Sequence, residues 1–259
     1  MDKFSKIGVF DSGLGGLSVL HTIRQIMPNE SLIYIGDSGN APYGTKEKSE
    51  VLNLSKKVCD TLVSKDVKAI VIACNTATSA AVNELRRAYD IPIIGMEPAI
   101  KPALRQTEGK VLVLATEMTL KEEKFKQLVD SLEEGYRIIK MPAPEWVQLV
   151  ENHMSESDYV KKEVEGFLDK VTEKIDAVVL GCTHFIFLKP YIMAYYKDQV
   201  EIFDGNMGTA LQLKNLLESH KWLNDNSEMG SVEIINTKSG VFVKKSYEMF
   251  DWLEMRDEF

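Results

Sequence analysis

Two cysteines occupy the same place in two similar stretches of this 259-residue chain. Residues 66–76 (DVKAIVIACNT) align without a gap on residues 174–184 (KIDAVVLGCTH), so that Cys74 stands opposite Cys182, 108 positions later. Each stretch is an apolar, β-branched run that stops at the cysteine, a pattern typical of a buried parallel strand with a thiol at its carboxyl end. Two thiols on either side of one bound molecule could remove a proton from one face of a carbon atom and return a proton to the other face.

Further polar residues stand where predicted strands end. Asp11 and Ser12 follow the apolar residues 7–10 and begin the glycine loop DSGLGG, and Thr116 follows the similar run at 110–115. Ligands of open parallel sheets gather beyond the carboxyl ends of the strands, because loops and helix amino termini meet there. We therefore expect these residues to lie near the two thiols.

The residues after each cysteine suit an anionic ligand. We expect their backbone amides to begin a helix, whose field lowers the thiol pKa from about 8.5 and favours a carboxylate substrate. Asn75, Thr76 and Thr183 can donate hydrogen bonds to that carboxylate. His184, two residues after Cys182, could tune the thiol or bind the substrate.

Each of these residues also has an ordinary structural explanation. Asp11 and Ser12 could cap the following helix, and the Tyr43-Gly44 pair could be a simple turn. Glu151 could lie on an exposed helix face, and Cys59, in the middle of a predicted helix, is expected to pack in the core. The glycine loop lacks the spacing of a dinucleotide or P-loop motif, and no set of residues has the spacing of a zinc site.

The elements that would position these residues alternate between strands and helices and occur twice. The run at 110–116 resembles that at 6–12, which with the cysteine repeat indicates a duplicated unit. Strands are predicted at 7–10, 31–36, 66–73 and 91–95, then at 110–115, 137–141, 175–181 and 201–203. Helices are predicted at 17–27, 46–65 and 77–89, then at 121–133, 146–153 and 159–174, and a tail follows with a helix at 208–222, a strand at 232–237 and a helix at 242–253.

This order predicts an α/β protein with two pseudo-symmetric domains, each an open parallel sheet with helices on both faces. We expect the tail to return to the first sheet, so that residues 1–97 plus 205–259 form the first domain and residues 98–204 the second. The active site is then expected in the cleft between the domains.

The amino-acid composition and net charge argue against several classes of protein. The net charge of −8 and the pI of about 5.2 argue against nucleic acid or an anionic membrane surface as a partner. No apolar run approaches the roughly 20 residues of a membrane-spanning helix, and residues 1–6 leave no room for an export signal. Three cysteines in such a chain are expected to be reduced, which favours a cytoplasmic protein.

Five motifs together resemble those of glutamate racemases, in the cofactor-independent aspartate/glutamate racemase superfamily, over essentially the full length. They are DSGLGG at 11–16, PYG at 42–44, ACNTA at 73–77, EPA at 97–99 and GCTH at 181–184. The resemblance implies that Cys74 and Cys182 are the paired acid and base, assisted by Asp11, His184 and the helix residue Glu151. It also implies substrate binding by Asp11, Ser12, Tyr43, Gly44, Asn75, Thr76, Thr116, Thr183 and His184.

The chain departs from the family pattern at three places. Ala115 and Met118 replace two glycines of the loop that contains Thr116 and Thr119, which weakens the case for substrate contacts there. Ile186 replaces a proline, and we expect only a local change of packing. Ala143 stands where a cysteine is frequent, which leaves the two proposed bases untouched.

The resulting hypothesis is proton exchange at Cα between L- and D-glutamate without a cofactor or metal. The resemblance further implies a homodimer and a role in supplying D-glutamate for peptidoglycan. An aspartate racemase or another racemase of the superfamily remains an alternative, because a thiol pair does not specify the length of the substrate. A cysteine hydrolase with Cys182 as nucleophile and His184 as base, or a catalytically silent binding protein, are more distant alternatives.

Overall fold

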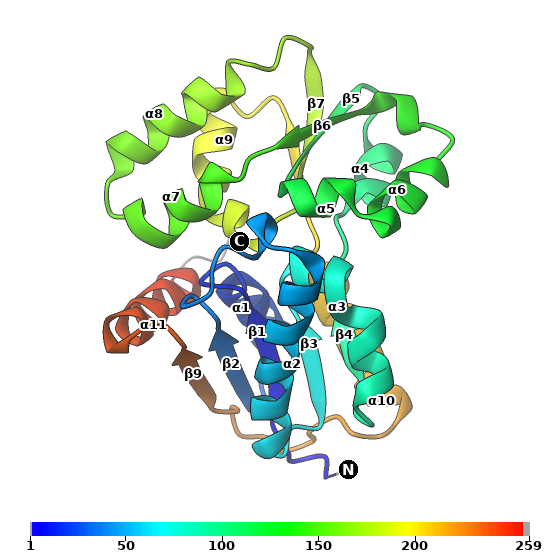
Figure 1. Cartoon of the computed structure of the whole chain (residues 1–259), viewed down its shortest axis with the longest axis vertical. Coiled ribbons are helices and arrows are strands. Elements are labelled where there is room, and N and C mark those ends of the chain that lie inside the picture. The colour runs from blue at the N-terminus through cyan, green and yellow to red at the C-terminus, as the bar shows by residue number, and fades with distance from the viewer. Residues whose placement is uncertain (1, 256–259) are drawn as a thin grey trace.

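Two parallel sheets, one above the other, form the framework of the computed structural model, which describes residues 2–255 (Figure 1). The first sheet has the order β4-β3-β1-β2-β9 and the second the order β6-β5-β7-β8. The strands of the first sheet are β1 (Ile7–Asp11), β2 (Leu32–Gly36), β3 (Ala69–Ile72), β4 (Ile93–Gly95) and β9 (Val232–Asn236). Those of the second are β5 (Lys110–Ala115), β6 (Ile138–Pro142), β7 (Ile175–Leu180) and β8 (Glu201–Asp204).

The strand orders confirm the duplication. The second sheet in the order β8-β7-β5-β6 repeats the order β4-β3-β1-β2 of the first, so β3 and β7, the strands before the two cysteines, are equivalent. All pairings are parallel. The added strand β9 pairs with β2 in register from Val232 opposite Leu32, so the tail returns to the first sheet. Where the two domains begin and end stays a prediction.

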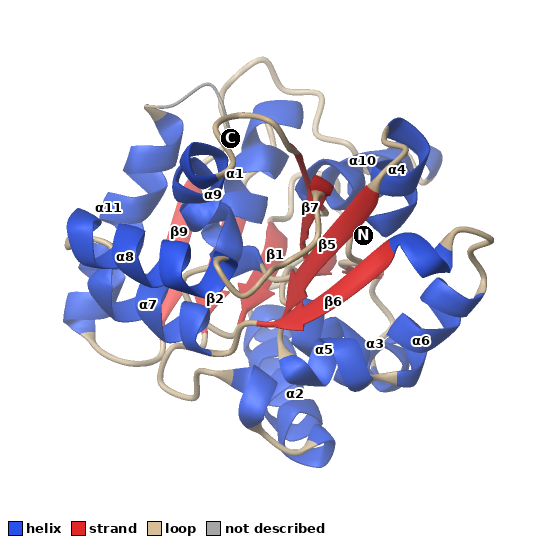
Figure 2. Cartoon of the chain, turned by 90° about the horizontal axis from the view of Figure 1, so that it is seen from above, coloured by secondary structure: helices blue, strands red, loops and turns tan. Residues whose placement is uncertain are grey.

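Helices cover both faces of each sheet, as predicted (Figure 2). Ile7 and Val9 of β1 pack in one apolar cluster with residues of α1 (Leu17–Ile26), α10 (Asn206–Ser219) and α11 (Gly240–Glu254). Phe10 belongs to a second cluster, with residues of α2 (Lys48–Ser64) and α3 (Asn75–Ala88). Because the side chains of a strand alternate between its two faces, β1 is buried on both.

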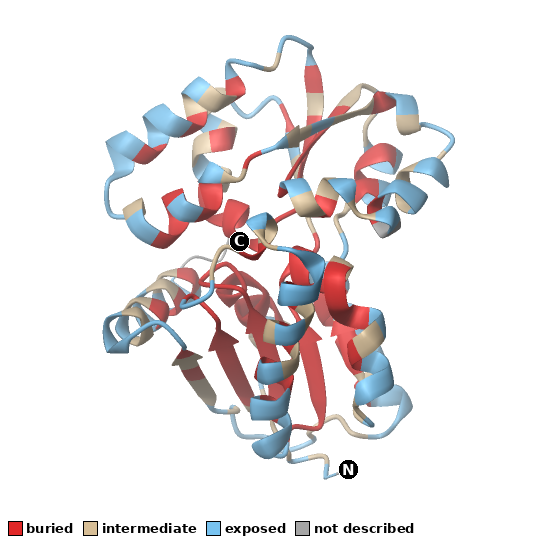
Figure 3. Cartoon of the chain, viewed as in Figure 1, coloured by how far each residue is buried: buried red, intermediate tan, exposed pale blue. Residues whose placement is uncertain are grey.

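The second sheet is covered in the same way. Its helices are α4 (Ile100–Gln106), α5 (Glu117–Lys121), α6 (Glu123–Asp130), α7 (Glu145–His153), α8 (Ser157–Leu168) and α9 (Lys189–Tyr195). Residues of α7, α8 and α9 share one apolar cluster with α1 and α10 of the first unit. The core is therefore continuous where the two units meet, and Figure 3 shows buried residues at this junction.

Several predicted helix ends differ from the structure. The predicted helix 121–133 is interrupted, because α5 ends at Lys121 and Glu122 is extended before α6 begins. The predicted helix 159–174 ends at Leu168, and the β-branched Val171 and Thr172 that follow have low helix propensity. α4 has no counterpart in the prediction, and its Pro102 lies in the first turn, where no backbone donor is lost.

Candidate active site

The first thiol lies where β3 ends and α3 begins. Cys74 is the N-cap residue of α3, and its Sγ atom accepts a hydrogen bond from the Ala77 amide at 3.3 Å. The thiol donates to the Ser12 hydroxyl at 3.6 Å, and the side chain is only 5% exposed. The sequence correctly predicts that a helix begins beside this cysteine.

The expected lowering of the thiol pKa is wrong for Cys74. Burial and the negative charge of Asp11 raise the pKa of Cys74 to about 12, although the bonds from Ala77 and to Ser12 act in the opposite direction. One helix terminus offsets only part of the cost of placing a thiolate in a dry site. Cys74 is therefore a thiol near neutral pH.

The second thiol has a different neighbour. Cys182 precedes a 3₁₀ helix, η3 (Thr183–Leu188), and its Sγ atom lies 3.8 Å from Nδ1 of His184. Nε2 of His184 lies 2.8 Å from Oε1 of Glu151. Burial alone would lower the pKa of His184, but its hydrogen bonds to Cys182 and Glu151 outweigh burial and raise that pKa well above 6.5. A charged imidazolium thus connects the thiol with a carboxylate.

Glu151 is buried, so the alternative of an exposed helix residue is wrong. Its carboxylate lies at the junction of the two units, where it accepts a hydrogen bond from the Leu14 amide at 2.6 Å. Burial favours the neutral acid, but the hydrogen bond and charge of His184, with the Leu14 amide, lower the pKa of Glu151 below 4.5. α7 is thereby joined to the glycine loop.

Asp11 is fully buried at the end of β1. Its carboxylate accepts hydrogen bonds from the Gly13 amide at 3.0 Å and from the Thr183 hydroxyl at 3.1 Å. Burial raises the pKa of Asp11, an effect that the charge of His184 only partly offsets. Asp11 does not cap the following helix, because the N-cap residue of α1 is Gly16.

The glycine loop is shaped by close packing against the second unit. A Cβ atom on Gly13 would lie 2.0 Å from Oε1 of Glu151, and one on Gly15 would lie 2.5 Å from Nδ1 of His184. Neither position can hold a larger residue without a shift. The glycines here allow two catalytic candidates to approach the backbone.

Three threonine hydroxyls meet across the junction. Thr76, in the first turn of α3, lies 3.0 Å from Thr116 and 3.4 Å from Thr119 (Oγ1 to Oγ1). Thr116 is the N-cap residue of α5 and accepts from the Thr119 amide. Gly44 packs against Thr116, since a Cβ atom there would lie 2.7 Å from that of Thr116. Thr119 was not among the predicted site residues, and its spacing of three from an N-cap threonine is a weak local signal.

Two predicted binding residues are engaged with other side chains. The Tyr43 hydroxyl, in η1 (Tyr43–Thr45), donates to Asp37 at 2.6 Å. The amide nitrogen of Asn75 lies 3.2 Å from the Met96 sulfur. The Oδ1 atom of Asn75 is buried and finds no hydrogen-bond donor among the residues that the structure describes. This oxygen could accept a hydrogen bond from a ligand.

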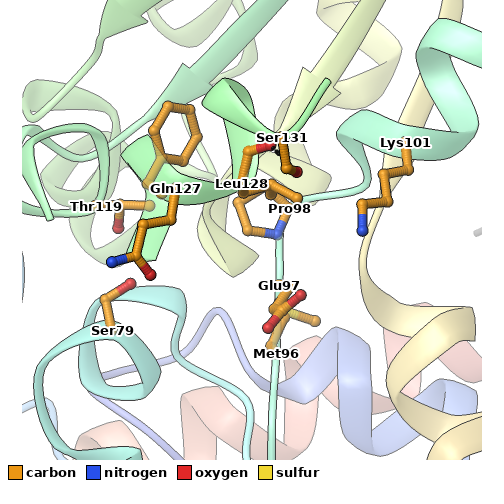
Figure 4. A pocket seen from close by; sticks show the side chains of 10 residues that line it. Ser79, Met96, Glu97, Pro98, Lys101, Thr119, Gln127, Leu128 and Ser131 are labelled. Carbon is orange, nitrogen blue, oxygen red and sulfur yellow. Dashed lines mark hydrogen bonds between the residues drawn. The ribbon is translucent and has the colours of Figure 1, made fainter. Parts of the chain in front are cut away.

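A small cavity lies beside the threonine cluster (Figure 4). Its volume is about 230 Å³, and Thr119 forms part of its wall. Figure 4 shows Ser79 of α3 facing Gln127 of α6 across it, with Glu97 and Pro98 nearby. The described residues of its lining include neither thiol, so this cavity is separate from the thiol site.

The predicted catalytic residues therefore meet in one buried region, supplied by both sheets. The charge of Cys182 is among the influences that raise the pKa of Cys74, so the two thiols share an electrostatic environment. Such a pair can act as proton donor and acceptor. Among residues 2–255, no helix is both long and apolar enough to cross a membrane.

Comparison with known proteins identifies the family. The profile of the Asp/Glu/Hydantoin racemase family matches residues 7–212. The chain belongs to this family. A glutamate racemase from Bifidobacterium adolescentis, a family relative, is 47% identical over 242 residues, which cover 92% of this chain and 94% of the relative.

Solved structures of glutamate racemases have the same fold as this family member. Isoform RacE1 from Bacillus anthracis matches with a TM-score of 0.86 and 32% identity, covering 97% of this chain and 95% of that chain. The Francisella tularensis enzyme in complex with D-glutamate matches with a TM-score of 0.81 and 28% identity, covering 99% and 96% of the two chains.

Proposed function

We propose that this protein interconverts L- and D-glutamate by proton exchange at Cα between Cys74 and Cys182. The observation that carries the proposal is the burial of both thiols at one junction, each with its own hydrogen-bond partner. Support for glutamate comes from the relative in Bifidobacterium adolescentis, which is named glutamate racemase, and from the Francisella tularensis structure, which holds D-glutamate.

In the mechanism, one cysteine removes the Cα proton as a thiolate while the other donates a proton as a thiol. The roles exchange when the reaction runs in reverse, and no covalent bond to the substrate forms. Cys74 is the acid in the resting enzyme, because the pKa of its thiol is about 12. The imidazolium of His184 lies 3.8 Å from the Cys182 sulfur, where it can assist proton transfer at this thiol.

The main difficulty is the weak acidity of the Cα proton of an amino acid. The negative charge that develops on the substrate carboxylate must be stabilised by groups already in place. Asn75, Thr76 and Thr183 carry the hydrogen-bond donors, and each is at least nine-tenths buried; the Thr183 hydroxyl, which donates to Asp11 here, must turn to the substrate to donate to it. Exclusion of water strengthens these interactions, so we infer that the reaction proceeds without an organic cofactor or a metal.

The remaining site residues bind the substrate. Asp11 and Ser12 both act on Cys74. The charge of Asp11 raises the pKa of the thiol, and the hydroxyl of Ser12 accepts a hydrogen bond from it. We assign Tyr43 and Gly44 in η1, with Thr116 of the second unit, to substrate binding as well, because Gly44 packs against Thr116. That placement lets both sheets hold one small dicarboxylate.

Wider features of the protein follow from this function. We infer a homodimer, since closed two-fold dimers are the commonest assembly, and a cytoplasmic enzyme that supplies D-glutamate for peptidoglycan. The two domains that open and close around the substrate are residues 1–97 with 205–259, and residues 98–204.

The decisive experiment is incubation of the purified protein with L-glutamate in deuterated water without added cofactor. Optical rotation should decay to zero while deuterium enters Cα of the product, because the donated proton comes from a thiol that exchanges with solvent. Optical rotation that stays constant with no label would refute the proposal. Parallel incubation with L-aspartate distinguishes the substrates, and faster racemisation of aspartate would reassign the specificity.

A further inference from the structure

The C-terminal helix reaches the catalytic region through one lysine. α11 packs on the first sheet, and Figures 1 and 2 both show it beside α7 of the second unit. The ammonium group of Lys245, on α11, donates a hydrogen bond to the main-chain carbonyl of Glu151, on α7. Lys245 thus joins the two units next to the carboxylate that holds His184.

The main-chain carbonyl of Glu151 needs a hydrogen-bond donor from outside α7. α7 ends at His153, so Glu151 lies in the last turn, where the carbonyl oxygens lack intrahelical donors. A cation at this end is also favoured by the helix dipole. The contact therefore has the geometry of a helix cap supplied by another domain.

A cavity borders the contact between Lys245 and the end of α7. A cavity of about 580 Å³ separates α11 from the second unit here, and its walls include Met154, Phe187, Lys245 and Trp252. Burial lowers the pKa of Lys245 and the charge of Lys238 acts in the same direction, while the charges of Glu151 and Glu248 raise it. The lysine is half-buried in the wall of this cavity and bridges it to Glu151 of α7.

We propose that Lys245 is a positioning residue for the racemisation, which caps α7 and thereby holds the Glu151 carboxylate against His184. Two further contacts carry the effect to the thiol: Oε1 of Glu151 lies 2.8 Å from Nε2 of His184, and Nδ1 of His184 lies 3.8 Å from the Cys182 sulfur. A shift of the end of α7 moves this chain of contacts and misplaces the imidazolium. Cys74, held by Ser12 and the Ala77 amide, is not in the chain.

The inference rests on the proposed function, and a matched set of variants tests it. Lys245→Met keeps the aliphatic stem and removes the donor, while Lys245→Arg keeps a donor. Lys244→Met is the control, because Lys244 is the next residue on α11, is 79% exposed and pairs with Glu248 at 3.5 Å. All four proteins are compared for kcat and KM with each glutamate enantiomer, and by circular dichroism for intact folding.

We expect Lys245→Met to lower kcat about 10- to 100-fold with KM within about twofold, since small misplacements near the reacting atoms have effects of this size. Lys245→Arg should recover most of the activity, and Lys244→Met should match wild type. Lys245→Met with unchanged kcat, or a loss shared equally by Lys244→Met, would overturn the inference. Wild-type protein without racemase activity would instead refute the proposed function.

A second measurement separates positioning from a general loss of stability. Cys182 takes the Cα proton from only one enantiomer, so Lys245→Met should raise the Cα-deuterium isotope effect on kcat/KM for that enantiomer and not for the other. Adding Lys245→Met to Glu151→Gln should produce little further loss, because both changes act through the same carboxylate. Equal isotope effects in both directions, or fully additive losses, would contradict the proposed role.

Discussion

The two thiols differ in the groups that control them. The Cys74 sulfur accepts a hydrogen bond from the Ala77 amide and donates one to the Ser12 hydroxyl. The negative charge of the Asp11 carboxylate also acts on it. Cys182 instead lies beside a histidine whose charge is maintained by Glu151. A reaction that runs in both directions needs each thiol to change role, so each must be able to hold and to release a proton. Cys74 holds its proton at rest, because burial and the charge of Asp11 raise the pKa of its thiol to about 12.

Substitution of each cysteine tests the two-base mechanism. Cys74→Ala and Cys182→Ala should each lower the racemisation rate by about 10³-fold or more, because general acid and base groups contribute factors of this size. Cys59→Ala should keep its activity, since Cys59 is buried in α2 within the apolar cluster of the first sheet. Polarimetry measures the rates and thermal unfolding checks the fold.

The same variants distinguish a cysteine hydrolase. In that alternative only Cys182 and His184 would be needed, and an acyl-enzyme would be visible by mass spectrometry. Full activity in Cys74→Ala would therefore contradict the two-base mechanism.

The buried pair of Glu151 and His184 makes stability depend on pH. The lowered pKa of Glu151 gives a contribution that is present above pH 4.5 and is lost as the pH falls through the folded value. The raised pKa of His184 gives one that is complete below pH 6.5 and is lost as the pH rises through the folded value. Both contributions are present together between these limits.

Glu151→Gln should therefore lower the free energy of unfolding by about 3 kcal/mol in this window, because it leaves a buried imidazolium without its partner. The difference from wild type should shrink at higher pH, where His184 becomes neutral. Urea unfolding of both proteins at about pH 5.5 and at a series of higher pH values measures it. A difference that does not change with pH would show that the pair is not ionised.

Residue types point to most of the candidate site, while burial sets the electrostatics of its residues. The repeat around Cys74 and Cys182, and the histidine after the second, are visible in the sequence and meet in the structure. The sequence cannot show that Glu151 is buried, because its surroundings come from distant parts of the chain. The Leu14 amide that donates to its carboxylate, for example, is 137 positions away. For the same reason the expected direction of the pKa shift of Cys74 is wrong, since the cost of burying a thiolate depends on residues that are distant in the sequence.

At the scale of elements, the glycine loop packs closely against the second unit. Gly15→Ala should reduce both activity and stability, because the new Cβ atom would lie 2.6 Å from the backbone nitrogen of His184, which cannot swing away. We expect a loss of about 2 kcal/mol, typical of overpacking. Thermal unfolding and steady-state kinetics measure the two effects.

Gly166→Ala is the matched control. Gly166 lies in α8 with nothing within 4 Å of the added Cβ atom, so alanine should raise stability by about 0.5–1 kcal/mol and leave activity unchanged. Equal effects of the two substitutions would show that the loop does not press against η3.

The strands were predictable because their β-branched runs are buried on both faces, as the burial of β1 and β3 shows. The ends of the helices were less predictable from the sequence, because tertiary contacts determine where a helix stops. Glu122 interrupts the predicted helix 121–133 and pairs with Lys48 of α2 at 2.9 Å, a contact across the two units. α4 and α9 are short and packed by neighbours, which no local pattern specifies.

The whole molecule is closed around the thiols. Cys74 and Cys182 are 5% and 8% exposed, and the units are joined beside them by Thr183 with Asp11 and by Leu14 with Glu151. A substrate can reach the sulfur atoms only if the units separate. Movement at the Glu97-Pro98 crossing has space available, because the cavity in Figure 4 lies there.

Thiol alkylation should therefore report the opening of the molecule. We expect iodoacetamide to modify Cys74 and Cys182 at a rate limited by separation of the units. Cys59, fully buried in the core of the first unit, should react only on global unfolding. Mass spectrometry of digested samples gives the three rates separately.

Added D-glutamate should slow the reaction of the two site thiols and leave Cys59 unchanged, because a bound substrate favours the closed state. If all three cysteines reacted at one rate, or if glutamate had no effect, access would depend on unfolding of the whole chain rather than on movement between its two sheets.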